Sequence, residues 1–262
     1  MIFLKHHHTV RGFSLLGIFV ALACTVVIMS IYMSSVQKAV TGGTGTSSKT
    51  SVWGMQDQIQ LQLISKALTM SAIMGGDSLL IPSDISGSRE SFDNTSANFW
   101  SALIMENLVK SEQLVSPTDR GWVEVAKYNY YAGDWDPNFS ADLNTTSNVS
   151  YAHMPLWGER LKKRWNTQSG RYPILSNRGP QDGVEGSTSI TLDDDGTWRG
   201  WVVHADGSID WQDGTTTSSR WNRRDGVMND NIFLMEEEDS KEDAILGFTD
   251  EMDDYGPILI WD

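Results

Sequence analysis

Cysteine is almost absent from this chain: its 262 residues include one, Cys24. A single cysteine excludes an intramolecular disulfide, and it excludes zinc sites built from four cysteines or from two cysteines and two histidines. The sequence also lacks the His-Glu-x-x-His motif of zinc proteases and the Gly-x-Ser-x-Gly motif of serine hydrolases. We therefore expect a protein without catalytic activity.

Basic residues are scarce too, with 20 Lys and Arg against 34 Asp and Glu. No cluster of Lys and Arg provides the phosphate-neutralising patch that nucleic-acid binding requires, so we expect no nucleic-acid partner. The acidity is uneven along the chain. Residues 230–262 hold 12 acidic residues and one lysine, whereas residues 34–229 hold 22 acidic and 17 basic residues. The C-terminal part is therefore predicted to be an acidic segment.

Charge of either sign is missing from residues 13–33, a run of 21 that reads FSLLGIFVALACTVVIMSIYM. At about 1.5 Å rise per residue, a helix of this length crosses a hydrocarbon core of roughly 30 Å. Lys5 and Arg11 precede the run and no charge follows until Lys38. The positive-inside bias then places the N-terminus in the cytoplasm and everything after the run on the other side of the membrane.

The junction before this run reads RGFSLL at residues 11–16. It resembles the class III signal of type IV pilins and type II secretion pseudopilins, in which a basic leader ends in Gly and is followed by Phe, a Ser or Thr and two aliphatic residues. The resemblance implies that a prepilin peptidase cleaves between Gly12 and Phe13 and methylates the new amino group. It also implies a single-pass protein of the bacterial inner membrane, with a periplasmic or extracellular head, that assembles with other pilin-like subunits.

One position departs from the pattern of this family. The fifth mature residue is usually Glu, thought to pair with the amino terminus of a neighbouring subunit, and here it is Gly17. An unpaired amino terminus in lipid is costly. The departure therefore favours a minor or non-assembling subunit over a major filament subunit.

Two further stretches are similar to a pseudopilin-like group abundant in planctomycete-type bacteria. They read LVSPTD at residues 114–119 and VVHADGSIDW at residues 202–211. The resemblance implies a pilin-like α+β fold, in which a long N-terminal transmembrane helix is followed by a head with helices packed on an antiparallel β-sheet. The predicted parts are a leader, a transmembrane helix, a Gly/Ser/Thr-rich hinge, an exoplasmic head and an acidic segment, at residues 1–12, 13–40, 41–51, 52–229 and 230–262.

Periodicity and turn residues indicate the elements of the head. Residues 52–74 are predicted to form a helix. The apolar positions that lie three and four residues apart along it are Ile59, Leu63, Ala67, Met70 and Met74. A second helix is predicted at residues 97–110, capped by Thr95 or Ser96. Strands at 188–192, 197–204 and 209–211, joined by Asp-Gly turns, predict a β-meander.

One stretch has the residue types of a calcium loop. Asp134, Asp136, Asn138 and Asp142 alternate oxygen ligands as the start of such a loop does. However, Phe139 replaces the glycine that makes the sharp turn. The alternative interpretation is that these are ordinary turn residues.

Tryptophan is abundant, with 11 residues, four of which surround the predicted meander. Trp198 and Trp201 are predicted to lie on opposite faces because their spacing is odd. An exposed Trp201 or Trp211 would suit stacking on sugar rings, whereas packing beneath a helix is the alternative. The sequence thus suggests two hypotheses, a non-enzymatic pseudopilin-like component of a secretion or pilus-like assembly, and a membrane-anchored binding module, for instance for carbohydrate. An anchored hydrolase is a third.

Overall fold

The structure, a computed structural model, describes part of the chain beyond Ser51. It covers residues 52–75, 79–88, 91–119, 122–129, 135–143, 146–186, 192–193, 195–217, 230–235 and 243–261. The predicted leader, transmembrane helix and hinge, including Gly12, Phe13 and Gly17, lie outside these residues. Among the residues that are covered, no helix is both long enough and apolar enough to span a bilayer.

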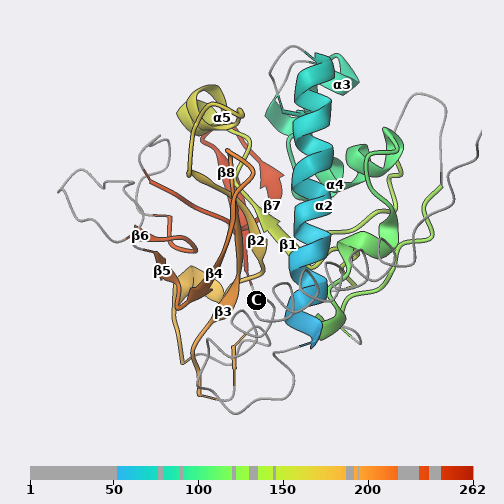
Figure 1. The fold of residues 1–262 in the computed structure, drawn as a ribbon. Helices are drawn as coiled ribbons and strands as arrows, with labels where there is room; N and C mark the ends of the chain where they lie inside the picture. Colours follow the sequence, from blue (N-terminus) through green and yellow to red (C-terminus); the bar gives the residue numbers. More distant parts are fainter. Residues whose placement is uncertain are drawn as a thin grey trace, which may run out of the picture. The chain divides into compact units, whose positions relative to one another are not determined.

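The described residues combine helices with antiparallel strands, so the α+β class is confirmed (Figure 1). The helices are α2 (Val52–Gly75), α3 (Pro82–Ser86), α4 (Ser96–Met105) and α5 (Gly158–Arg164), with 3-10 turns η1 (Ser91–Asp93), η2 (Ser111–Leu114), η3 (Pro117–Asp119) and η4 (Gln181–Gly183). The main sheet has the order β1 (Tyr151–His153), β2 (Pro173–Asn177), β3 (Arg199–His204) and β4 (Ile209–Asp213). Two smaller pairs join β5 (Thr216–Thr217) to β6 (Asp230–Asn231) and β7 (Phe248–Met252) to β8 (Pro257–Ile260).

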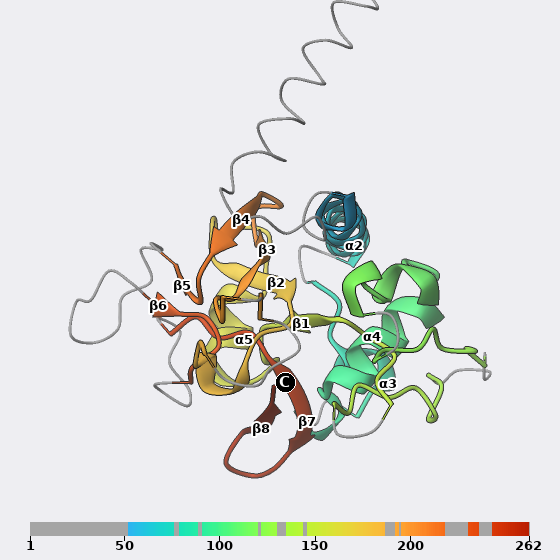
Figure 2. The ribbon, with the colours of Figure 1, turned by 90° about the horizontal axis from the view of Figure 1, so that it is seen from below.

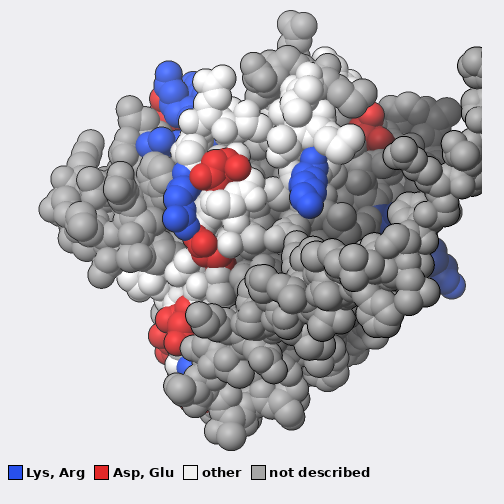
Figure 3. Space-filling view, viewed as in Figure 1, with Lys and Arg blue, Asp and Glu red and all other residues white. Residues whose placement is uncertain are grey.

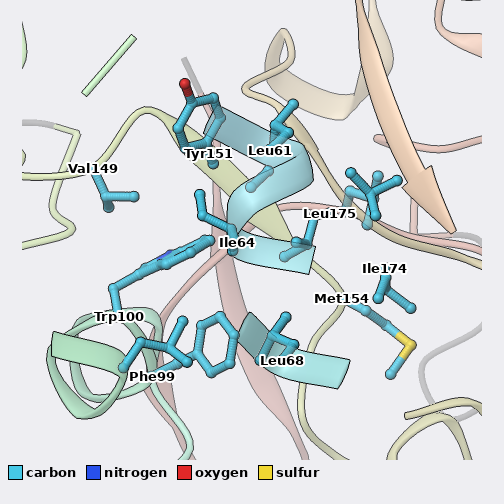
Figure 4. Close-up of a cluster of buried hydrophobic side chains, with 14 of the residues drawn as sticks. Leu61, Ile64, Leu68, Phe99, Trp100, Val149, Tyr151, Met154, Ile174 and Leu175 are labelled. Atoms are coloured by element: carbon cyan, nitrogen blue, oxygen red, sulfur yellow. The ribbon is translucent and has the colours of Figure 1, made fainter. Parts of the chain in front are cut away.

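Helix α2 packs against the main sheet, where it contacts β2 and β3. Its side chains Leu61, Ile64 and Leu68 are fully buried, and they lie among residues of the sheet and the Phe99 and Trp100 rings of α4 (Figure 4). Each such side chain contributes about 1.5–3 kcal/mol when it leaves water. Seen end-on, α2 has the sheet and α4 on one side, and its other side faces away from both (Figure 2).

The prediction of a helix at residues 52–74 is confirmed, but most of its predicted apolar stripe does not face the core. Ile59, Leu63 and Met70 are 56%, 43% and 60% exposed, whereas Ala67 is buried. The core takes the neighbouring positions, such as Leu61, because α2 is apolar on two faces and the sheet covers one of them.

Helix α4 matches its prediction at the start and ends earlier. The Thr95 side chain caps it by accepting a hydrogen bond from the Asn98 N–H, and Phe99 and Trp100 face inward as expected. The helix ends at Met105 because Asn107 adopts a left-handed conformation, with φ of 56°.

The β3–β4 hairpin confirms the second half of the predicted meander. Its turn contains Gly207 at φ of 79°, a conformation that costs glycine little. The expected first strand is different, because β2 and not residues 188–192 pairs with β3. Leu192 forms only an isolated bridge to Trp198, and residues 187–191 lie outside the described part.

The described residues of the acidic segment pack onto the same compact unit as the rest of the head. Phe233 stacks edge-to-face on Trp198, with ring centroids 4.8 Å apart. Further along, Asp243 pairs with Arg160 of α5 at 2.6 Å, with both side chains 1% exposed. The Asp243 carbonyl accepts hydrogen bonds from Arg160 Nε and the Tyr172 hydroxyl. This ion pair attaches the last part of the chain to α5.

Removing one partner of this pair should destabilise the head strongly. A buried charge that loses its partner costs about 3–5 kcal/mol. We expect Arg160→Leu to lower the free energy of unfolding of the purified full chain by that amount in urea denaturation. Lys162→Leu, at a position 69% exposed in the same helix, should change it by less than about 1 kcal/mol. Equal effects of the two substitutions would contradict the assigned role of the pair.

Candidate functional site

The two tryptophans proposed for sugar binding face each other across β3 and β4. Trp201 and Trp211 are directly opposite in the register, and their rings meet edge-to-face with centroids 5.1 Å apart. Trp201 is 8% exposed, and its Nε1 donates to the Gly54 carbonyl in the first turn of α2 at 2.7 Å. Trp211 remains 38% exposed. The Trp201 ring therefore packs beneath a helix, which was the alternative to stacking on sugar rings.

Trp198 lies on the other face of the sheet, as the odd spacing predicted. It is fully buried, and its Nε1 donates to the Arg178 carbonyl at 2.7 Å. The fourth tryptophan near the meander, Trp221, lies outside the described residues.

A buried polar network joins the start of α2 to the sheet. The Tyr151 hydroxyl of β1 lies 3.0 Å from Asp57 Oδ1 and 2.8 Å from Gln60 Oε1, and Asn177 Nδ2 of β2 donates to Asp57 Oδ2 at 3.2 Å. Gln60 Nε2 in turn donates to the carbonyls of Glu112 and Val115. Satisfied buried networks of this kind fix one packing arrangement among several.

Burial changes the protonation of this network. Desolvation is the main cause that raises the pKa of Asp57 to about 6, although hydrogen bonds from Ser116, Tyr151 and Asn177 act in the opposite direction. Burial and the neighbouring Asp57 carboxylate also raise the pKa of Tyr151 well above its ordinary value. Asp57 and Gln60, three residues apart, share one face of a helix, but only the packing of α2 on the sheet shows that this face is buried.

The acidic residues proposed for calcium are only partly described. Asp134 lies outside the described residues. Asp136 is buried, and its carboxylate accepts hydrogen bonds from the N–H groups of Asn129 and Asn138 and from Asn138 Nδ2. Those hydrogen bonds lower the pKa of Asp136, although desolvation acts to raise it. Asp142 lies further along the same loop, where its own N–H donates to the Ser140 hydroxyl.

Asp136 makes the contacts of an ordinary turn residue, which was the alternative to a calcium ligand in the sequence analysis. Within the described part of the chain, no three His, Cys, Asp or Glu side chains gather around a point where an ion could sit.

A serine lies beside a histidine in the core, an arrangement that the sequence did not indicate. Ser96 Oγ, in the first turn of α4, is 2.7 Å from His153 Nε2 of β1. His153 Nδ1 lies 2.8 Å from the Met154 carbonyl, which can only accept, so Nδ1 carries the proton and Nε2 accepts from the serine. Ser96 Oγ also accepts from the Thr249 N–H of β7 at 2.7 Å.

This hydrogen-bonding pattern is that of a serine and its general base. Ser96 and His153 are both 0% exposed, and the His153 ring packs against Phe99 and Trp100. Burial lowers the pKa of His153 to about 4, although its hydrogen bond to Met154 acts to raise it. In the described structure the pair links α4, β1 and β7 and has no access to solvent.

Comparison with known proteins adds no relative from which a role could be transferred. No family model, curated protein or solved structure matches this chain. The interpretation of each candidate site therefore depends on its own geometry. By that criterion the network at the start of α2 and the Ser96–His153 pair are both internal links between elements.

The Asp57 network gives the head a specific pH dependence. A carboxyl whose pKa is raised in the folded state contributes stability below its unfolded pKa of about 4, and that stability is lost as the pH rises through 6. The Asp57→Asn side chain is neutral at every pH. The free energy of unfolding of this variant should therefore rise relative to that of the parent chain by on the order of 3 kcal/mol between pH 4 and pH 7. Urea denaturation of both chains at several pH values measures this difference. A difference that stays constant with pH would contradict it.

The buried serine gives a second test, on reactivity. A fluorophosphonate, which phosphonylates base-activated serines with loss of fluoride, should leave the folded full chain unlabelled because Ser96 and His153 are both 0% exposed. Mass spectrometry of tryptic peptides detects the adduct. Labelling of Ser96 that disappears in His153→Gln would overturn this assignment and support the hydrolase hypothesis.

Proposed function

We propose that this chain is a non-enzymatic, pseudopilin-like subunit of a type II secretion or type IV pilus-like assembly in a bacterial inner membrane. The observation that carries the proposal is the RGFSLL junction at residues 11–16, placed directly before 21 uncharged residues. A basic leader followed by a run of this length suits a segment that stays in the membrane after the leader is removed.

The described fold supports the proposal at the level of fold class. The resemblance implies a head in which helices pack on an antiparallel sheet, and α2 packs on the antiparallel sheet of β1 to β4.

Gly17 narrows the proposal to one kind of subunit. Without a carboxylate at the fifth mature position, the chain cannot make the pairing that the family pattern assigns to Glu there. A minor subunit, which joins the assembly through other contacts, suits this sequence better than the repeating subunit of a filament.

The processing step provides the decisive experiment. In a bacterium with an active prepilin peptidase, the mature chain should begin at Phe13 with an N-methylated amino group, and mass spectrometry of the intact protein and its N-terminal peptide detects both changes. Gly12→Leu should retain the leader because the residue before the scissile bond no longer fits the signal. Gly17→Ala, outside the junction, serves as the matched control and should be processed like the parent.

An intact Met1 leader on the parent chain in such a host would refute the proposal. A leader removed at a different bond would do so as well, and would indicate an ordinary signal peptidase.

A further inference from the structure

The buried network at the start of α2 has more acceptors than hydrogen atoms when Asp57 is ionised. The Tyr151 hydroxyl lies 3.0 Å from Asp57 Oδ1 and 2.8 Å from Gln60 Oε1, and both of these oxygens then act only as acceptors. A hydroxyl carries one hydrogen, so it can donate to one of them at full strength. The other oxygen is left facing the Tyr151 oxygen at hydrogen-bond distance with no hydrogen between them.

Reversing the Gln60 amide does not supply the missing hydrogen. Gln60 Nε2 donates to the carbonyls of Glu112 and Val115 at 3.2 and 3.3 Å, and a carbonyl can only accept. The Glu112 side chain is exposed, so at this position the network meets the backbone alone. In the reversed amide Oε1 would face both carbonyls, and two contacts between acceptors would replace one. The two carbonyls therefore fix Oε1 toward Tyr151.

The other oxygen of the Asp57 carboxyl group already has a donor. Asn177 Nδ2 of β2 donates to Asp57 Oδ2 at 3.2 Å. The Asn177 amide is fixed in turn, because its Oδ1 accepts the Trp201 N–H of β3 at 2.8 Å. A proton on the carboxyl group therefore belongs on Oδ1, where Asp57 can donate it to the Tyr151 oxygen and leave the Tyr151 hydrogen for Gln60.

Burial makes the neutral form of Asp57 the favourable one. On the face shown in Figure 3, the described basic and acidic side chains form small separate groups at the surface, where water solvates them. Asp57 is instead 4% exposed, and Gln60 and Tyr151 are 7% and 0% exposed. An ionised carboxylate loses solvation in such a place. Desolvation is accordingly the main cause that raises the pKa of Asp57 to about 6.

The neighbouring elements add one carboxylate to this environment. Asp119 of η3 acts by repulsion to raise the pKa of Asp57. Arg178, directly after β2, balances that charge in part, with its Nε 3.2 Å from Asp119 Oδ2. From β1, Tyr151 stays neutral, because burial raises the pKa of its hydroxyl well above the ordinary value. From β3, the uncharged Trp201 donates its Nε1 hydrogen to the backbone in the first turn of α2.

We propose that Asp57 forms a proton-operated latch, in which a proton on Oδ1 holds the start of α2 on the sheet and its loss releases the first turns of the helix. With the proton in place, Asp57 donates to Tyr151 and Tyr151 donates to Gln60. When the proton leaves to solvent, the carboxylate takes the Tyr151 hydrogen and Gln60 Oε1 is left buried without a donor. The buried charge and the unsatisfied acceptor both favour opening. All of these groups lie in the described head, so the latch is independent of the proposed function.

The latch is closed at acidic pH and loosens toward neutral pH. When the first turns of α2 open, Asp57 enters water and its pKa returns to the ordinary value of about 4. The raised pKa in the closed state therefore stabilises the latch fully below about pH 4, and this stabilisation is lost as the pH rises to the closed-state pKa of about 6. The difference between the two pKa values corresponds to an increase of about a hundredfold in the opening equilibrium from pH 4 to pH 7.

Hydrogen exchange of the purified full chain, followed by mass spectrometry, tests this release. Asp57→Asn is the central variant, because its amide is neutral at every pH and can donate to Tyr151 as the protonated carboxyl group does. The exchange rate of residues 54–61 in the parent, divided by the rate in Asp57→Asn at the same pH, should rise about a hundredfold between pH 4 and pH 7. The same ratio for residues 68–75, at the far end of α2, should stay near one. Asp84→Asn, the same substitution at an exposed position of α3, is the matched control and should exchange like the parent.

Infrared spectroscopy detects the proton itself. A protonated carboxyl group has a C=O stretching band that carboxylates lack. The difference spectrum between the parent and Asp57→Asn should contain this band at about pH 5 and lose it by about pH 8. Gln60→Met removes the acceptor that competes for the Tyr151 hydrogen, so the carboxylate can take that hydrogen at no cost to Gln60. This substitution should therefore lower the pH at which the band disappears by about one unit.

Four results would overturn the latch. The first is a difference spectrum without the protonated band at about pH 5, and the second is an unchanged midpoint of this band in Gln60→Met. The third is an exchange ratio for residues 54–61 that does not depend on pH. The fourth is a ratio that rises equally at both ends of α2, because the proton would then act on unfolding of the whole head and not on its first helical turns.

Discussion

The packing of α2 on the main sheet is the contact on which the rest of the described structure depends. Leu61, Ile64 and Leu68 fill the space between β2, β3 and the aromatic side chains of α4. Without α2, that face of the sheet would lie open to water. The same contact determines which side of α2 is left uncovered, because a helix that buries one face must turn the opposite one outward.

Polar interactions fix α2 at its first turns, and apolar packing holds it further along. Gly54, Asp57 and Gln60 are all engaged by groups of the sheet or of the loops beside it. Hydrogen bonds are directional, whereas apolar contacts tolerate small shifts along the helix axis. The network therefore sets the register of α2 on the sheet, at the end of the helix that follows the predicted hinge.

The sequence predicted local features of the head well and long-range ones poorly. The helix at 52–74, the Thr95 cap and the 205–208 turn depend on residues close together in the chain, and each is found. The face of α2 could not be chosen because two sets of apolar residues, one beginning at Ile59 and one at Leu61, repeat at helical spacing. Only the tertiary partner decides between them.

The candidate sites show the same difference between local features, which the sequence predicts, and long-range ones, which it does not. The opposite faces of Trp198 and Trp201 follow from strand geometry and were predicted. The pairing of Ser96 with His153, 57 positions apart, depends on how α4 meets β1, which no local pattern encodes. The acidity of residues 230–262 likewise concealed a set of apolar residues, among them Phe233 and Phe248, that pack onto the head.

Helix α2 has a second apolar face, which is exposed in the described head. The inner face of α2 is sufficient to hold it on the sheet, so nothing in the folding of the described head requires Ile59, Met70 or Ile73 to be apolar. Polar residues at these positions would make the head more soluble at little cost in stability. The apolar residues on this second face are therefore not explained by the packing of the described head.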